Sequence, residues 1–261
     1  MTNAAGERDI WTLDRALKTL SRVTRIGDAH DPSWLPDGQS VSFLSFKSRG
    51  GPLMIVPADG ATGPVPVPIG SEFSPADLVN PGGWLPDGTV YIGGVTDHGA
   101  PSDLWRVPRA GSRPVKIVGT PADELAPMVS PDGKWVAHQS NETGRVEIYV
   151  RGLDGRGGRV QVSNLGGSGP IWDPKGNLLY YVESDGDRRR LIAAALRTSP
   201  TLATLGRTVV FSDLRLEESD NHPNYDIHPD GSRFVMPEAG TRASLVAVFD
   251  WVKSVSGSRE R

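Results

Sequence analysis

The residues of this sequence that could do chemistry lie mainly in the polar stretches that precede its apolar runs. Carboxylates and imidazoles bind divalent cations, basic peptides and protons, so they would suit a metal site, a partner surface or acid–base catalysis. Arginines further along the chain add positive charge. As candidate contacts for a ligand or partner we select His30, Asp31, Asp123, Glu124, Asp220, His222 and Arg188.

The spacing of these residues favours binding over catalysis. The chain has no Gly-x-Ser-x-Gly sequence, no His-Glu-x-x-His sequence and no EF-hand loop, and its five histidines are scattered. Asp123 and Glu124 could form a catalytic carboxylate pair as in glycosidases, but neighbours on a loop usually both face water. We therefore predict no catalytic residue, no metal site and no cofactor. A hydrolase or lyase that uses the acidic loops is the alternative.

One short turn recurs along the chain. Pro-Asp-Gly stands at residues 36–38, 86–88, 131–133 and 229–231, and Pro174-Lys175-Gly176 is a variant of it. Proline fixes φ for the second position of a turn, aspartate bonds back to the local backbone, and glycine adopts a left-handed conformation at little steric cost. A run of β-branched and aromatic residues follows each turn, which is typical of a strand. The repeat predicts five similar hairpins.

A second pair of short strands follows most of these hairpins, so a unit holds four strands in about 40–50 residues. This is the pattern of a propeller blade, which must stack on other blades to bury its faces. We predict an all-β fold, a β-propeller of four-stranded blades with five Pro-Asp-Gly-type units and five to six blades. The units span residues 31–69, 81–118, 126–163, 168–212 and 223–251.

Aromatic residues recur at equivalent places in these units. They are Trp34, Trp84, Trp105, Tyr149 and Trp172. A row of aromatic rings can form a carbohydrate platform. Because the rings recur from unit to unit, however, we predict that they pack between blades.

Residues 9–24 fit either an amphipathic helix or two strands. We favour two strands because Asp9-Ile10-Trp11 resembles Asp103-Leu104-Trp105 and Glu147-Ile148-Tyr149, each of which starts an outer hairpin. These strands would be the outer half of a blade whose inner half lies elsewhere, and pairing with the last unit would remove exposed sheet edges. The total of about 21 strands is one too many for five blades and three too few for six. An irregular closure and a piece of a larger propeller both stay open.

Composition and charge narrow the classes of partner. The 261-residue chain has a formal net charge of −3 and no cysteine, so we predict no nucleic-acid binding and no disulfide framework. No apolar run is long enough to span a membrane, and the polar N-terminus lacks the apolar stretch of a secretion signal. We predict a flexible N-terminus at residues 1–8, a propeller over 9–252 and a flexible tail at 253–261, in a monomer that does not insert into membranes.

Two stretches of the chain resemble a known family. Residues 130–151 read Ser-Pro-Asp-Gly-Lys-Trp-Val-Ala-His and end in Glu-Ile-Tyr-Val-Arg, and residues 224–236 repeat the turn and the strand. They resemble TolB-type repeats, also called WD40-like or PD40 repeats, and the propellers on the C-terminal side of some bacterial serine/threonine kinases. The resemblance covers residues 9–252. It implies a propeller, protein–protein contact and a periplasmic or extracytoplasmic location. The kinase motifs are absent, so kinase activity is not implied.

These observations lead to one prediction of function. We expect a non-catalytic binding or scaffolding propeller, a sensor or interaction module whose partner is a protein or peptide.

Overall fold

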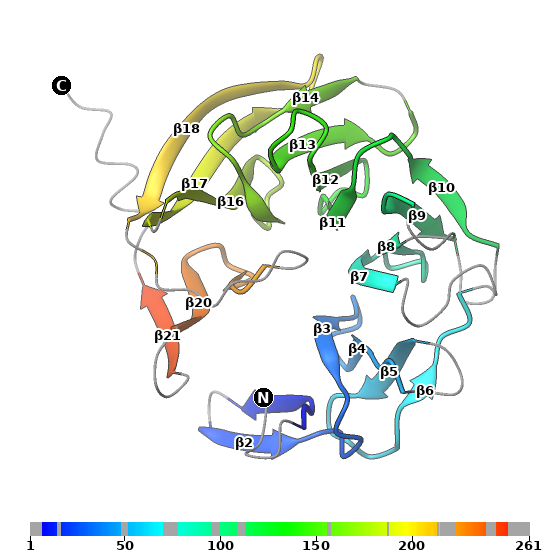
Figure 1. Cartoon of the computed structure of the whole chain (residues 1–261). Coiled ribbons are helices and arrows are strands. Elements are labelled where there is room, and N and C mark those ends of the chain that lie inside the picture. Colours follow the sequence, from blue (N-terminus) through cyan, green and yellow to red (C-terminus); the bar gives the residue numbers. More distant parts are fainter. Residues whose placement is uncertain are drawn as a thin grey trace. The chain divides into compact units, whose positions relative to one another are not determined.

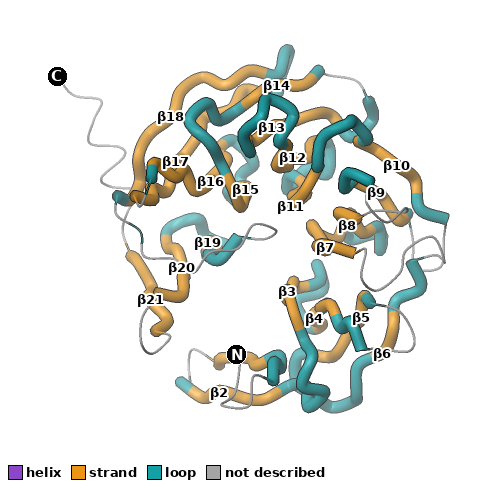
Figure 2. The backbone as a smooth tube through the Cα atoms, viewed as in Figure 1, coloured by secondary structure: helices purple, strands orange, loops and turns teal. Residues whose placement is uncertain are grey.

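The computed structural model describes residues 7–14, 17–47, 52–69, 78–94, 100–108, 113–155, 158–186, 188–212, 214, 223–238 and 244–249. The chain divides into two compact units, residues 1–120 and 121–261. All regular secondary structure in the described residues is β-strand, in short antiparallel sheets (Figure 1). Figure 2 shows these strands joined by loops and turns. The described part of the chain therefore contains no helix that could cross a membrane.

The first unit contains a two-stranded sheet, β1-β2, and two four-stranded sheets, β3-β4-β5-β6 and β7-β8-β9-β10. Its strands are β1 (Trp11–Asp14), β2 (Thr19–Arg22), β3 (His30–Trp34), β4 (Ser40–Leu44), β5 (Leu53–Pro57), β6 (Val65–Pro66), β7 (Leu78–Trp84), β8 (Val90–Gly94), β9 (Asp103–Val107) and β10 (Val115–Val118). Each four-stranded sheet follows chain order, as a propeller blade does.

The second unit contains two four-stranded sheets, β11-β12-β13-β14 and β15-β16-β17-β18, and one three-stranded sheet, β19-β20-β21. Its strands are β11 (Glu124–Val129), β12 (Trp135–Ser140), β13 (Glu147–Gly152), β14 (Arg159–Gln161), β15 (Ser168–Trp172), β16 (Leu178–Asp185), β17 (Arg188–Arg197), β18 (Ala203–Phe211), β19 (Asp226–Ile227), β20 (Arg233–Glu238) and β21 (Ser244–Phe249). The predicted all-β fold with four-stranded blades is confirmed.

The Pro-Asp-Gly turns join the first two strands of a sheet, as their residue types predict. Asp37 Oδ1 accepts hydrogen bonds from the backbone N–H groups of Gln39 (2.8 Å) and Ser40 (3.0 Å). Gly38 adopts φ 64° and Gly133 φ 68°, which a residue with a Cβ adopts only at a cost. Local chemistry is therefore enough to set each of these hairpins.

Two of the recurrent tryptophans join neighbouring sheets. The indole N–H of Trp84 donates to Ser42 Oγ (2.9 Å), and that of Trp172 donates to the carbonyl oxygen of Met128 (2.9 Å). Packing between blades is thus confirmed for these two rings. Trp34 is 54% exposed, so the prediction is wrong for that residue.

The two strands predicted within residues 9–24 are confirmed, and the helical interpretation is wrong. β1 and β2 pair antiparallel, with Leu13 opposite Leu20. Asp9 lies just before β1 and is 3% exposed, and its carboxylate accepts hydrogen bonds from Thr24 Oγ1 and the Ile26 N–H. The buried Asp9 carboxylate therefore links the start of the hairpin to the residues that follow β2.

Candidate functional site

His30 lies in a polar network at the start of β3. Its Nε2 is 3.1 Å from Asp28 Oδ1, and its Nδ1 is 2.9 Å from the Arg8 guanidinium. Asp28 Oδ2 accepts hydrogen bonds from Ser45 Oγ (3.0 Å) and the Lys47 N–H (2.8 Å). Burial alone would raise the pKa of Asp28, but these hydrogen bonds outweigh it and hold the pKa below its usual value. The network joins β3 to the end of β4.

Asp31 occupies a bend that recurs in the first strand of three sheets. Its φ is 49°, and Ala126 (48°) and Gly169 (58°) hold the same place five residues before the turn proline. The strand register shifts at each of these positions, so each is a β-bulge. Because the three residue types differ, the sequence carries no signal of this bend.

Asp123 and Glu124 point in different directions although they are neighbours in the chain. The Asn141 side chain accepts a hydrogen bond from the Asp123 N–H (2.9 Å) and donates one to its Oδ2 (3.0 Å). Glu124 is 1% exposed, and its Oε1 accepts a hydrogen bond from Ser140 Oγ (3.2 Å). The expectation that both carboxylates face water is therefore wrong for Glu124, because β11 begins at this residue and turns it inward.

Glu124 faces a buried histidine on the adjacent strand. His138 Nε2 lies 3.1 Å from Glu124 Oε2, and both side chains are 1% exposed. Burial lowers the pKa of His138, because its charged form would lose hydration, and the contact with Glu124 offsets only part of this effect. Arg151 and Arg159 add to the lowering through their positive charges.

This pair predicts a loss of stability in mild acid. Unfolded histidine titrates near pH 6.5, whereas folded His138 stays neutral to lower pH, so the unfolded state binds the extra proton. We expect the free energy of unfolding to be constant above that pH and to fall below it, by up to about 1.4 kcal/mol per pH unit for this group. Urea denaturation between pH 7.5 and 5.5 measures the effect. His138→Gln should flatten the profile, and an equally steep profile in that variant would contradict the assignment.

Of the remaining selected residues, Arg188 joins neither cluster. Arg188 is exposed and begins β17, paired in register with Asp185, in a different sheet from Asp123 and Glu124. Asp220 and His222 lie outside the described residues. Within the described ranges, no three histidine or acidic side chains are placed to hold a metal ion.

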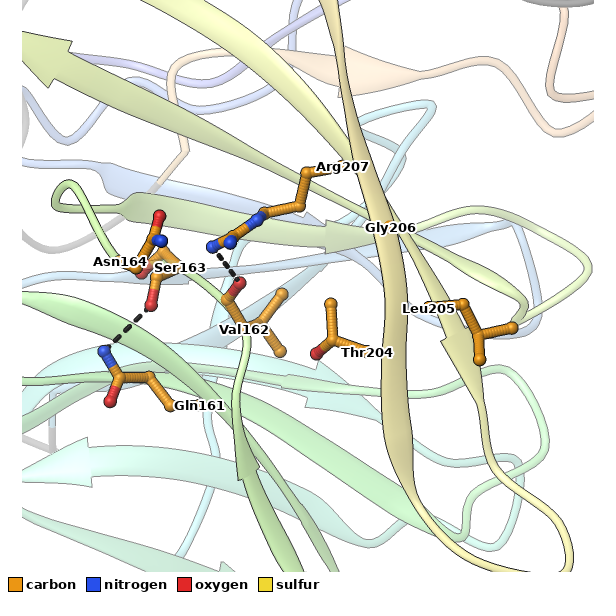
Figure 3. Close-up of a pocket in the computed structure, with 8 residues that line it drawn as sticks. All are labelled: Gln161, Val162, Ser163, Asn164, Thr204, Leu205, Gly206 and Arg207. Carbon is orange, nitrogen blue, oxygen red and sulfur yellow. Dashed lines mark hydrogen bonds between the residues drawn. The ribbon is translucent and has the colours of Figure 1, made fainter.

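A groove that the sequence analysis missed lies between β14 and β18, the outer strands of two neighbouring sheets (Figure 3). Its volume is about 650 Å³, and we call it the β14–β18 groove. It is lined by Gln161, Val162, Ser163, Asn164, Thr204, Leu205, Gly206 and Arg207. The lining residues come from two segments about 40 residues apart, and neither segment carries a recognisable motif.

Arg207 is the one charged residue among those eight. Its Nη1 donates to the carbonyl oxygen of Val162 (3.1 Å), which holds the guanidinium across the groove (Figure 3). Leu205 lies at a register shift between β17 and β18, where it is the extra residue of a bulge and is 62% exposed. Figure 3 shows its side chain on the far side of β18 from Val162 and Thr204.

The loop after β14 carries further exposed apolar surface beside the groove. Asn164 lines the groove and Leu165 follows it, 53% exposed. The Arg145 guanidinium donates to the Asn164 carbonyl oxygen (2.8 Å), and the Gly167 N–H donates to the Val146 carbonyl oxygen (3.0 Å). Val146 is also exposed, so Val146 and Leu165 lie on neighbouring segments at one end of the groove.

Comparisons with known proteins identify the fold of the chain but do not assign it to a sequence family. No protein-family model matches the chain, and no curated protein matches it. Many solved structures do, among them a protein assigned as TolB from Agrobacterium tumefaciens, at TM-score 0.71 and 18% identity over 92% of this chain and 83% of that one. TolB from Acinetobacter baumannii matches at TM-score 0.71 and 15% identity over 93% of this chain.

The chain spans 57% of the length of the Acinetobacter protein. An oligogalacturonate lyase in complex with manganese is also similar, at TM-score 0.62 and 16% identity over 96% of this chain and 70% of that one. Identities this low establish architecture rather than activity. The four-stranded sheets, the recurrent turns and the TolB structures together show that the chain has a TolB-like β-propeller fold.

Proposed function

We propose that the chain is a non-catalytic protein-binding propeller whose β14–β18 groove receives an extended acidic segment of a partner protein. The observation that carries this proposal is the combination of a groove of about 650 Å³ with a single charged lining residue, Arg207. Guanidinium groups pair with carboxylates through two parallel hydrogen bonds, which gives both strength and orientation. The amides of Gln161 and Asn164 add neutral donors and acceptors around it.

The strand beside the groove supports an extended conformation for the bound segment. β18 is nine residues long and lies at the outer end of its sheet, and its residues 205–209 are all exposed. An outer strand presents backbone N–H and C=O groups to which a further strand can bond. Side chains of a strand added there would alternate between the two faces of the sheet, so every second one would point towards the groove.

Exposed apolar residues supply contacts that do not depend on charge. Leu205 on β18 and Leu165 beyond Asn164 are both more than half exposed. Apolar anchors flanked by polar groups are typical of the part of an interface that carries most of the binding free energy. Glu124 is buried against His138, so it is not available to a partner. The other residues selected from the sequence remain predicted further contacts: His30, Asp31, Asp123, Asp220, His222 and Arg188.

Site-specific photo-crosslinking tests the proposal. A benzophenone amino acid at Asn164, which is exposed and lines the groove, should capture one protein from extracts of the source cell, with the soluble and envelope fractions treated separately. Mass spectrometry should locate the link in an acidic segment. The same group at Val115, which is exposed on the outer strand β10, is the matched control. Equal capture of the same protein from Val115 would contradict binding at the groove.

Affinity for the captured segment then tests Arg207. Arg207→Glu should weaken binding by roughly tenfold or more, since a charge-assisted hydrogen bond contributes about 1.5–3 kcal/mol. Arg197→Glu is the control, because Arg197 is an exposed arginine of the same sheet, on the strand paired with β18. Fluorescence anisotropy with the labelled segment measures both variants. Equal affinities would overturn the role of Arg207.

The alternative is an enzyme, since one of the similar structures is an oligogalacturonate lyase in complex with manganese. Incubating the purified chain with oligogalacturonate, with and without Mn²⁺, tests this directly, because a lyase forms unsaturated uronates that absorb ultraviolet light. We expect no absorbance change. Turnover that is lost in Asp123→Asn while the protein stays folded would replace the binding proposal with an enzymatic one.

A further inference from the structure

The hydrogen bonds of the hairpin β1–β2 match those of β13–β14, the two outer strands of a complete four-stranded sheet. The Ile10 N–H donates to Thr24 Oγ1 (2.9 Å), and the Ile148 N–H donates to Ser163 Oγ (2.7 Å). Each hydroxyl in turn donates to the acid immediately before that isoleucine, Thr24 to Asp9 and Ser163 to Glu147. The Val23 N–H donates to the Ile10 carbonyl as the Val162 N–H does to that of Ile148.

The residues that follow the second strand of each hairpin also match in conformation and hydrogen bonding. Gly27 and Gly166 both adopt a left-handed conformation, with φ of 69° and 88°. Their N–H groups donate to the same acids, Gly27 to Asp9 (3.3 Å) and Gly166 to Glu147 (3.1 Å). β1 therefore corresponds to the third strand of a four-stranded sheet, and β2 corresponds to the fourth strand.

The packing against the following sheet repeats in the same way. Ile10 and Val23 pack in one buried cluster with residues of β4 and β5, namely Val41, Phe43, Met54 and Val56. Ile148 and Val162 pack with the residues at matching positions of β16 and β17, namely Leu179, Tyr181, Ile192 and Ala194. The apolar face of the hairpin is thus covered as in the complete sheet, and only its edge differs.

In the complete sheet, β13 lies between β12 and β14. In the described residues β1 has one strand partner, β2, on the side to which the Ile10 carbonyl points. Because backbone groups alternate along a strand, those of Trp11 and Leu13 point to the opposite edge. Leu13 is 47% exposed, and Trp11 is 37% exposed where its counterpart Tyr149 is 2% exposed.

We propose that this edge of β1 binds a β-strand from another polypeptide, antiparallel to β1, in the position that β12 takes beside β13. The register follows from the complete sheet, in which Tyr149 pairs with His138 and Arg151 with Val136. The incoming strand therefore places one residue opposite Trp11 and another opposite Leu13, and apolar side chains at these two places would cover both.

A strand of the chain's own described sheets does not fill this position. The strands that follow the Pro-Asp-Gly-type turns are β4, β8, β12, β16 and β20, and each of them already lies between two others. The last sheet also has its third place taken by β21, which pairs along β20 from Ser244 to Phe249. The occupant of the β1 edge is therefore an added strand with the alternating pattern of these inner strands.

A peptide of this chain's own inner hairpin is the probe. Residues 124–140, made as a fluorescently labelled peptide, contain the strand that pairs with β13. We expect it to bind the full-length chain in fluorescence anisotropy, whereas a scrambled peptide of the same composition does not bind. The absence of binding to the folded chain would overturn the proposal.

Two variants at one position separate edge pairing from apolar contact. Leu13→Pro removes the N–H that points to the free edge and leaves the bonds to β2, whereas Leu13→Ala keeps that N–H and removes the side chain. Leu13→Pro should weaken peptide binding at least tenfold relative to Leu13→Ala. Thermal melts of both variants confirm that the hairpin still folds. Equal binding by the two folded variants would show that the peptide does not add to β1.

Discussion

Replacing Glu147 with alanine is expected to lower the free energy of unfolding by about 3–5 kcal/mol. The carboxylate is 1% exposed and holds four groups together. Its Oε1 accepts hydrogen bonds from Arg145 Nε (2.9 Å) and Nη2 (2.6 Å). Ser163 Oγ donates to Oε2, and the Gly166 N–H donates to both oxygens (3.1 Å each). Removing it leaves a buried hydroxyl and a buried N–H without their acceptor, and each loss costs about 1–3 kcal/mol.

Urea denaturation measures this change, and Glu142, in the turn that joins β12 to β13, provides the control. Glu142 pairs with Arg159 at the surface, where ion pairs contribute less than about 1 kcal/mol. Glu142→Ala should therefore cost little. Glu147→Gln keeps the shape of the side chain and some of its hydrogen bonds. Its loss of unfolding free energy should therefore lie between those of Glu147→Ala and Glu142→Ala. Equal stability of Glu147→Ala and Glu142→Ala would refute the structural role of Glu147.

Deleting residues 1–24 is expected to lower the melting temperature by about 10 °C or more. The deletion removes Ile10 and Val23 from the cluster that covers Val41 and Phe43. Burial of one such aliphatic side chain contributes about 1.5–3 kcal/mol, and each kcal/mol shifts the melting temperature of a domain this large by about 2–4 °C. The newly exposed face of β4 and β5 adds to the loss.

Point variants show whether the packing of β1–β2 is the cause. Ile10→Ala should cost about 2–5 kcal/mol, as expected for truncating a buried aliphatic side chain. Leu17 is 73% exposed, so Leu17→Ala should leave the stability unchanged. Calorimetry of the three proteins gives the comparison. A melting temperature that does not change in the deletion variant would contradict the packing of β1–β2 on the following sheet.

Local chemistry in the sequence was sufficient to predict the strands and their order. Pro131, Asp132 and Gly133 each favour the same turn, and alternating runs on both sides make a hairpin there. The likeness of Asp9-Ile10 to Glu147-Ile148 also predicted β1 correctly. In both places the acid accepts a hydrogen bond from a hydroxyl after the next strand, and the isoleucine is buried. These features depend on residues close together in the chain, and they repeat.

The candidate site depended on which segments meet in space, and spacing in the chain does not carry that information. Asp123 and Glu124 look alike in the sequence, yet one bonds Asn141 near the surface and the other faces His138 in the interior. The groove at Arg207 exists because the outer strands of two sheets lie side by side. Turn chemistry and side-chain alternation are local, so the sequence determines them; the burial of a carboxylate and the walls of a groove arise only from tertiary packing.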